Sequence, residues 1–263
     1  VPVIAEINGI RLLIGGNADG AIYAMKVRTG EMVWGFTLSK RGINSSVVVA
    51  GDKVYATHSE ENIDNTALGR IVCIDGTGSG DVTATHEVWR YDSCFAGYTS
   101  PIIHDNRLYV VDNSANMYAL DAETGQLHWE YNIGTVGKGS PIYADGKIYA
   151  PEANGKLTIL APGEGAAKTL STTEIHMPDG RLAEIYSSPA VAYGRIYLAT
   201  EAGVFCIGDK DVPFVVEPSP AVYPREGAPS AATAAHLQIV PAEVLAQPGQ
   251  QVEFKARAYD KEG

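Results

Sequence analysis

Apolar and polar residues alternate in short runs along residues 1–210, with turn-forming residues between the runs. This two-residue period is typical of half-buried β-strands, and no amphipathic helical period interrupts it. In the clearest stretch the expected strands are Pro101–His104, Arg107–Val111, Asn116–Leu120 and Gln126–Glu130. Asp105-Asn106 suits the type I′ turn of a hairpin, and Gly125 supplies a positive backbone angle between the last two strands. The pattern predicts a four-stranded antiparallel unit and argues against helical solenoids and parallel α/β folds.

This unit recurs along the chain. A tryptophan stands in the last expected strand of the first three copies, at Trp34, Trp89 and Trp129. A second phrase, from a serine to a tyrosine, begins the later copies at Ser46–Tyr55, Ser100–Tyr109, Ser140–Tyr149 and Ser188–Tyr197. Four strands repeating about every 40 to 45 residues indicate an all-β fold, a β-propeller, whereas a β-sandwich would lack a motif recurring in phase. We expect about five blades, at residues 1–38, 44–91, 99–133, 139–176 and 187–210.

The strongest copy of the motif, Ala119-Leu-Asp-Ala-Glu-Thr-Gly-Gln-Leu-His-Trp129, resembles the repeat of the pyrroloquinoline-quinone-type propellers. That superfamily includes quinoprotein alcohol dehydrogenases and the outer-membrane assembly lipoprotein. The resemblance implies that the outer-strand tryptophan docks against a glycine-containing turn of the neighbouring blade. The implied docking motif comprises Trp34, Trp89, Trp129, Gly30, Gly125 and Asp121. The motif weakens elsewhere, since Lys26 replaces its aspartate, residues 76–86 interrupt the second copy, and the fourth copy has no tryptophan.

Five blades are fewer than the seven or eight with which members of the superfamily close. An open array exposes strand edges and an apolar flank, so we expect the missing blades to come from the rest of the polypeptide or from another chain. The start at Val1, without methionine or signal peptide, favours the same interpretation, a piece of a longer protein.

The composition changes after residue 210. Residues 211–235 are rich in proline and alanine and predict a semi-extended linker. Residues 236–263 contain two alternating stretches, Leu237–Pro241 and Val252–Ala258, which predict a β-hairpin. This hairpin resembles the start of an immunoglobulin-like module whose remainder would lie after Gly263.

Charge and cysteine content narrow the partner classes. The net charge of −11 and the pI near 5.0 argue against nucleic acid and anionic membrane surfaces as partners, and no apolar run is long enough to span a bilayer. Cys73 and Cys206 occupy the small position held by Ala119 in its copy, so we expect buried free thiols there, while Cys94 falls in a loop. The superfamily resemblance favours a periplasmic, cell-surface or secreted location.

Candidate cofactor chemistry is sparse. The related dehydrogenases hold the quinone between a tryptophan floor and two adjacent cysteines, with calcium beside it, whereas the three cysteines here are isolated and the three tryptophans take docking positions. Gly134–Ser140 lacks the glycine spacing of a phosphate loop, and the six histidines have no metal-ligand spacing. We therefore expect no catalytic residue, no bound cofactor and no metal site.

A binding role remains. Propellers bind through loops at one mouth of their channel, and Arg41, Tyr98, Lys138 and Tyr186 are the candidate contact rim. The favoured hypothesis is a non-catalytic scaffold module of a larger exported multidomain protein, contacting protein or glycan. Two alternatives stay open: a fragment of a quinone-dependent dehydrogenase, and an accessory propeller joined to a catalytic domain such as a hydrolase or kinase.

Overall fold

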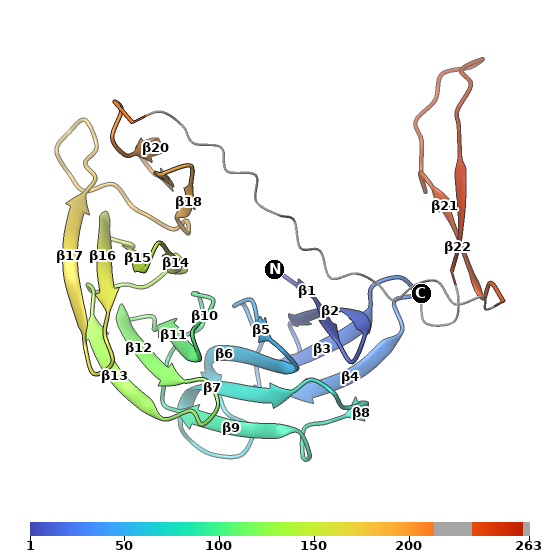
Figure 1. Cartoon of the computed structure of the whole chain (residues 1–263), viewed down its shortest axis with the longest axis horizontal. Helices are drawn as coiled ribbons and strands as arrows, with labels where there is room; N and C mark the ends of the chain where they lie inside the picture. The colour runs from blue at the N-terminus through green and yellow to red at the C-terminus, as the bar shows by residue number, and fades with distance from the viewer. Residues whose placement is uncertain (213–232, 260–263) are drawn as a thin grey trace.

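Five antiparallel sheets follow one another along an arc in the computed structural model, which describes residues 1–212 and 233–259 (Figure 1). Sheet 1 contains β1 (Val3–Ile7), β2 (Ile10–Gly16), β3 (Ala21–Lys26) and β4 (Met32–Thr37); sheet 2 contains β5 (Val48–Ala50), β6 (Lys53–Glu61), β7 (Leu68–Asp75) and β9 (Glu87–Asp92). Sheet 3 contains β10 (Ile102–His104), β11 (Arg107–Val111), β12 (Asn116–Asp121) and β13 (Leu127–Asn132). Sheet 4 contains β14 (Ile142–Ala144), β15 (Lys147–Glu152), β16 (Lys156–Pro162) and β17 (Ala167–Glu174); sheet 5 contains β18 (Ala190–Ala192), β19 (Arg195–Thr200) and β20 (Gly203–Ile207).

The first strands of the sheets, β5, β10, β14 and β18, lie along the inside of the arc, and β9, β13 and β17 lie along its outside (Figure 1). Strands that follow one another along the chain are neighbours in each sheet, which is therefore a meander, and residues 76–86 join β7 to β9. This arrangement confirms the prediction of an all-β propeller with a partial set of blades. Among the described residues, sheet 5 has three strands rather than four.

The hairpin turns have the predicted geometry. Asp105 and Asn106 have φ angles of 46° and 58°, and Asp145 and Gly146 have angles of 49° and 69°. Positive φ at both central residues defines a type I′ turn, whose twist matches the twist of the flanking strands. The turn residues therefore set the register of β10 with β11 and of β14 with β15.

The insertion at residues 76–86 contributes to sheet 1 rather than looping into solvent. Its short strand β8 (Gly80–Asp81) pairs in parallel with β4, with Trp34 opposite Gly80. Val82 follows, is 1% exposed, and donates its N–H to the Gly35 carbonyl at 3.0 Å. The segment between β7 and β9 of sheet 2 thus provides the fifth strand of sheet 1. The sequence pattern did not predict this pairing.

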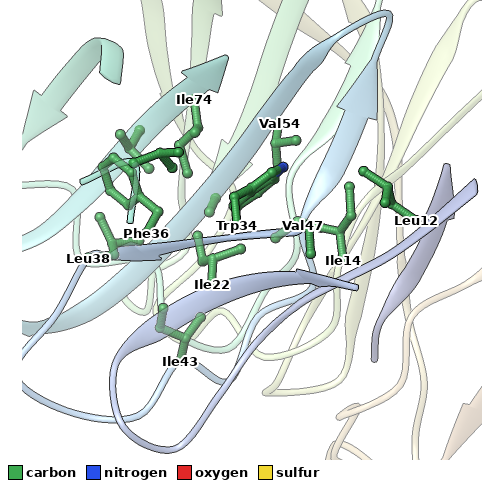
Figure 2. Close-up of a cluster of buried hydrophobic side chains, with 14 of the residues drawn as sticks. Leu12, Ile14, Ile22, Trp34, Phe36, Leu38, Ile43, Val47, Val54 and Ile74 are labelled. Carbon is green, nitrogen blue, oxygen red and sulfur yellow. The ribbon is translucent and has the colours of Figure 1, made fainter. Parts of the chain in front are cut away.

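The hydrophobic core is divided into clusters that lie between successive sheets. Figure 2 shows the first of them, in which Leu12, Ile14 and Ile22 of sheet 1 face Val54 and Ile74 of sheet 2 around the Trp34 ring. Equivalent clusters join sheet 2 to sheet 3, sheet 3 to sheet 4, and sheet 4 to sheet 5. Each sheet therefore buries its apolar side chains only against its neighbours, as in other repeat architectures.

The cysteine expectation was correct at one position and wrong at another. Cys73 and Cys94 are both fully buried, although Cys94 lies in the loop that leads to sheet 3. Cys206 is exposed, contrary to the prediction. Its place in the sheet is buried only where another sheet packs on that face, as sheet 4 does over Ala119, and no such sheet follows β20 among the described residues.

The expected C-terminal hairpin is present as β21 (His236–Val240) paired with β22 (Lys255–Tyr259). Its relationship to an immunoglobulin-like module stays a prediction, and most of the predicted linker, residues 213–232, lies outside the described residues. The Arg28 guanidinium donates a hydrogen bond of 2.8 Å to the Tyr259 hydroxyl. No helix within residues 1–212 and 233–259 could cross a membrane.

The packing between sheets predicts a contrast between two isoleucines of sheet 1. Ile22→Ala should lower the free energy of unfolding by about 2–5 kcal/mol, because Ile22 is fully buried in the core between sheets 1 and 2. Ile4→Ala removes the same atoms from a side chain that is 51% exposed and should cost no more than about 1 kcal/mol. Urea unfolding of both variants measures the difference, and equal losses would contradict this account of the core.

Candidate functional site

Each tryptophan joins its own sheet to the next one. The indole N–H of Trp34 donates to the Gly76 carbonyl at 2.9 Å, that of Trp89 to the Ala122 carbonyl at 2.9 Å, and that of Trp129 to the Gly163 carbonyl at 3.0 Å. Each acceptor lies in the turn between the third and fourth strands of the following sheet. The rings are at most 8% exposed. A buried indole needs a partner for its N–H, so one side chain supplies both apolar burial and a directional bond.

The receiving turn is shaped for the ring. Gly125 has φ of 72°, and a Cβ atom placed there would come within 2.5 Å of the Trp89 ring. Asp121 fixes the same turn, because its Oδ1 accepts hydrogen bonds from the Thr124 N–H at 2.8 Å and the Thr124 hydroxyl at 2.9 Å. Gly30 has the same backbone conformation in sheet 1, with φ of 73°, but no atom lies within 4 Å of the Cβ position.

A line of serines links the sheets at the start of their inner strands. The Ser46 N–H donates to the Ser100 hydroxyl at 2.9 Å, Ser100 N–H to the Ser140 hydroxyl at 2.8 Å, and Ser140 N–H to the Ser188 hydroxyl at 2.9 Å. These are the serines of the recurring phrase in the sequence. Their spacing was visible, but their role was missed because each bond joins residues at least 40 positions apart.

The candidate rim residues lie in the connections between sheets, and each contacts a neighbour. Lys138 Nζ lies 3.3 Å from the centre of the Tyr98 ring, which brings the β13–β14 and β9–β10 connections together through a cation–π contact. The Arg41 Nε is 3.2 Å from Glu61 Oε2. The Tyr186 hydroxyl donates to Glu184 at 2.7 Å, and this bond raises the pKa of the tyrosine. The structure therefore pairs Tyr98 with Lys138 but joins neither Arg41 nor Tyr186 to that pair.

A hollow of about 590 Å³ opens beside Arg41 at this mouth, lined by the β4–β5 connection, by β6 and β7 of sheet 2, and by the β9–β10 connection. Leu68 and Phe95, which are 48% and 40% exposed, form its apolar part. Its remaining lining consists of Arg41, Gly42, Asn44, Ser59, Glu60 and Glu61. Exposed apolar side chains surrounded by polar ones correspond to the apolar core and polar rim of protein interfaces.

A buried arginine, Arg70, anchors the β6–β7 connection next to this hollow. Arg70 is 2% exposed and donates hydrogen bonds of 2.6 Å to both Asp64 and Asp92. The bond from Arg70 lowers the pKa of Asp64 to about 2. Asn65 also donates to Asp92, at 2.9 Å. The β6–β7 connection is therefore tied to β9, and the acidic side chain of Asp64 has a structural role.

His58 lies in the same region and is 1% exposed. Its Nδ1 accepts the N–H of Glu60 at 3.2 Å, while Nε2 has no hydrogen-bond partner within the described part of the chain. Burial, and then the nearby Arg70 charge, lower the pKa of His58 to about 4. The imidazole is consequently neutral at pH 7. Sequence patterning gave no signal for it, because the burial of a polar side chain depends on distant segments.

Comparison with known proteins identifies the repeat. A family model described as outer membrane protein assembly factor BamB matches residues 18–211. The chain belongs to the BamB family. BamB of Legionella pneumophila (strain Paris) is 22% identical over 194 residues, which are 73% of this chain and 47% of the relative. BamB of Moranella endobia (strain PCIT) is 31% identical over 99 residues, which are 38% of this chain and 25% of the relative.

The crystal structure of BamB from Moraxella catarrhalis shares the fold. It aligns with a TM-score of 0.58 and 17% identity, covering 78% of this chain and 57% of that chain. The present chain therefore spans about half the length of the Legionella relative and somewhat more of the Moraxella structure.

The described residues of this BamB-family chain do not fit a quinone cradle. The three indoles are all committed to contacts between sheets, and Cys73 and Cys94 are buried in the core between sheets 2 and 3. No group of three or more histidine, cysteine, aspartate or glutamate side chains in residues 1–212 and 233–259 could hold a metal ion. We assign no redox chemistry to these residues.

Two glycines provide a test of the tryptophan contact. Gly30→Ala should cost about 1 kcal/mol, the strain of placing alanine at positive φ in open space. Gly125→Ala carries the same strain and should cost a further 1–3 kcal/mol, because the new Cβ overlaps the Trp89 ring. Urea unfolding compares the two variants. Equal costs would mean that the ring does not press on this turn in solution.

The buried histidine predicts a dependence of stability on pH. His58 has a folded pKa of about 4 against an ordinary value of 6.5, so it stabilises the fold fully above pH 6.5, and this contribution is lost as the pH falls toward 4. The His58 contribution should fall by about 2 kcal/mol between pH 7.5 and 5.0.

Urea unfolding at the two pH values measures this loss, and His58→Gln is the control. The His58→Gln variant loses packing at both pH values, but its free energy of unfolding should fall less between pH 7.5 and 5.0 than that of the unchanged protein. Asp64, with an ordinary pKa of 3.8, stabilises the fold throughout this window, and its contribution is lost only at lower pH. An identical fall in both proteins would contradict the assignment to His58.

Proposed function

We propose that this chain is a non-catalytic, protein-binding scaffold module that acts in the assembly of outer membrane proteins. The observation that carries the proposal is the surface formed by the connections between successive sheets. Phe95, Tyr98, Arg41 and Lys138 present aromatic and charged groups there. The relatives' name, outer membrane protein assembly factor, supports a protein partner over the glycan that the sequence left open. By the same likeness we propose a periplasmic or cell-surface location.

Rigidity supports a binding role for these connections. The tryptophan contacts and the serine line fix the angle between sheets, so the loops are held in place by their anchors. The β9–β10 connection is fastened further, because the Asn113 N–H donates to the Phe95 carbonyl at 2.8 Å and the Asn113 side chain accepts the Gly97 N–H at 3.1 Å. A preorganised surface loses little conformational entropy on binding.

The hollow beside Arg41 supplies the anchor region of the proposed interface. Phe95 and Leu68 offer apolar area that a partner side chain can cover, and Glu60 and Glu61 surround it with negative charge. Tyr98 and Lys138 extend the surface toward sheet 3 and sheet 4. A partner with an apolar anchor flanked by basic residues would complement this composition.

Site-specific photocrosslinking tests the proposal in cells that make the full-length protein. Benzoylphenylalanine at Phe95 should yield a discrete crosslinked adduct with another protein, because the side chain is 40% exposed beside the hollow. Val88, 44% exposed on the outer strand β9, is the control position and should yield none. Mass spectrometry of the adduct identifies the partner.

Reversing a charge that lines the hollow gives a second test of the same interface. Glu60→Lys should reduce the yield of the Phe95 adduct several-fold while leaving the melting temperature unchanged, since Glu60 makes no ion pair with the described residues. Crosslinks of equal yield from Phe95 and Val88 would contradict a binding mouth.

A further inference from the structure

A polar side chain at the end of the second strand holds the turn that follows in sheets 3, 4 and 5. In each case a side-chain oxygen accepts the N–H two residues ahead. The three bonds are Asp112 to the Ser114 N–H at 2.9 Å, Glu152 to the Asn154 N–H at 3.1 Å, and Thr200 to the Ala202 N–H at 3.1 Å. Each acceptor stands three residues after the tyrosine of the recurring phrase.

In sheet 2 this position is a histidine, His58, and its Nδ1 accepts the Glu60 N–H at 3.2 Å. The bond serves a bulge in the sheet, because β6 pairs with β7 at His58 and again at Glu61, with an irregularity between the two. Glu60 has no counterpart in the register of β7. The His58 ring therefore replaces the sheet as the partner of the Glu60 N–H.

Histidine differs from the other three acceptors in what a proton does to it. A neutral imidazole has one acceptor nitrogen, and the bond at Nδ1 places the ring proton on Nε2. A second proton, taken from water, occupies Nδ1 and leaves the ring without an acceptor. A carboxyl group that gains a proton keeps an acceptor oxygen, and a threonine hydroxyl does not titrate. Among these four contacts, only the one in sheet 2 is lost on protonation.

Residues 60–62, the segment that His58 holds, form one wall of the hollow described above. Glu60 and Glu61 contribute to its lining. The Glu61 carbonyl accepts the Lys40 N–H at 3.0 Å, so the segment also contacts the β4–β5 connection. A change in the bond from His58 therefore acts directly on residues of the hollow.

The surroundings of the ring oppose a second proton while the segment is closed. Arg70 lies opposite His58 on β7, and Asp92 of β9 is the acidic group whose charge acts on the ring. Both Asp92 and Asp64, from the β6–β7 connection, bond Arg70. Burial and the Arg70 charge outweigh the effect of Asp92 and hold the pKa of His58 at about 4.

The neighbouring connections add few charges to this region. Lys40 and Arg41 lie in the β4–β5 connection, and the bond from Arg41 lowers the pKa of Glu61. Residues 93–99, in the β9–β10 connection, include no acidic or basic residue. The pKa of Asp64 is also lowered, to about 2. Glu61 and Asp64 therefore stay charged over the pH range in which an ordinary histidine takes its proton.

The closed segment also contains two buried polar atoms that lack a hydrogen bond. His58 Nε2 and Asn62 Oδ1 have no partner within the described part of the chain, and the two residues are 1% and 0% exposed. A buried polar atom without a partner costs free energy of folding. Opening the segment returns both atoms to water, so it should cost less than opening a fully bonded turn.

We propose that His58 is a pH-sensitive latch on residues 60–62. Protonation at Nδ1 breaks the bond to the Glu60 N–H and places a second positive charge beside Arg70, so the segment is released from the wall of the hollow. Partner binding at the hollow then weakens as the medium becomes acidic. This last step rests on the proposed function of the hollow, whereas the release of the segment does not.

Amide hydrogen exchange of the full chain, followed by NMR, tests the latch. Protection is expressed relative to an unfolded peptide at the same pH, which removes the intrinsic pH dependence of exchange. If release gives His58 its ordinary pKa of 6.5, protection of the Glu60 amide should fall about 30-fold between pH 7.5 and 5.0. The Ser114 amide, which the Asp112 carboxylate holds, is the control and should keep its protection.

His58→Asn is the matched variant. Its Oδ1 takes the place of Nδ1 and can accept the Glu60 N–H at either pH, because an amide does not titrate in this range. Asparagine already holds the corresponding position in sheet 1, at Asn17, three residues after Ile14. The variant should show nearly the same Glu60 protection at pH 7.5 and 5.0, and unchanged Ser114 protection shows that it is folded.

Two exchange results would overturn the latch. The first is a fall in Glu60 protection no larger than the fall at Ser114, since the segment would then open only with the whole fold. The second is an equal fall in the His58→Asn variant, which would assign the pH response to another group.

The effect on binding is measured with the benzoylphenylalanine probe at Phe95, in permeabilised cells that make the full-length protein. The yield of the adduct should drop several-fold from pH 7.5 to 5.0 and stay constant when His58→Asn is added. A yield that does not change with pH would overturn the regulation of binding. Absence of the adduct at both pH values would instead contradict the proposed function, and hydrogen exchange would still decide the latch.

Discussion

The contact between an outer-strand tryptophan and the turn of the next sheet is the interaction on which the rest of the structure depends. A single four-stranded meander has two apolar faces and cannot bury both alone. The tryptophan of each contact buries its ring against the following sheet, and its indole N–H donates to a carbonyl in a turn of that sheet. Because the bond is directional, it sets the angle between sheets as well as their adhesion.

The proposed binding function depends on this constraint, because the candidate contact residues lie in connections between different sheets. Lys138 lies in the connection from sheet 3 to sheet 4 and contacts Tyr98 in the connection from sheet 2 to sheet 3. The serine line reinforces that angle on the inner side of the arc, while the tryptophans act nearer its outside. The serine bonds and the tryptophan bonds join each pair of sheets at two separate points. Together they restrict both sliding and tilting of one sheet against the next, and so fix the connections relative to one another.

Sequence analysis was accurate where the signal is local or periodic, as in the type I′ turn at Asp105 and the phase of the tryptophans. It was inaccurate where burial depends on a neighbouring sheet. Cys206 has the sequence environment of a buried residue but lies on an uncovered face. Arg70 looks like a surface residue in its strand, yet Asp64 and Asp92 from other segments enclose it. The strand pairing of Gly80 depends on the same long-range geometry.

The two ends of the arc differ in a way that gives the array a direction. In sheet 1 no atom lies within 4 Å of the Cβ position of Gly30, whereas in sheet 5 the last described strand, β20, leaves Val204 79% exposed. Each internal contact runs one way along the chain, from the tryptophan of one sheet to the turn of the following sheet. The same repeat pattern is therefore buried inside the array and exposed in its outermost sheets, because the burial of each sheet depends on the neighbouring sheet.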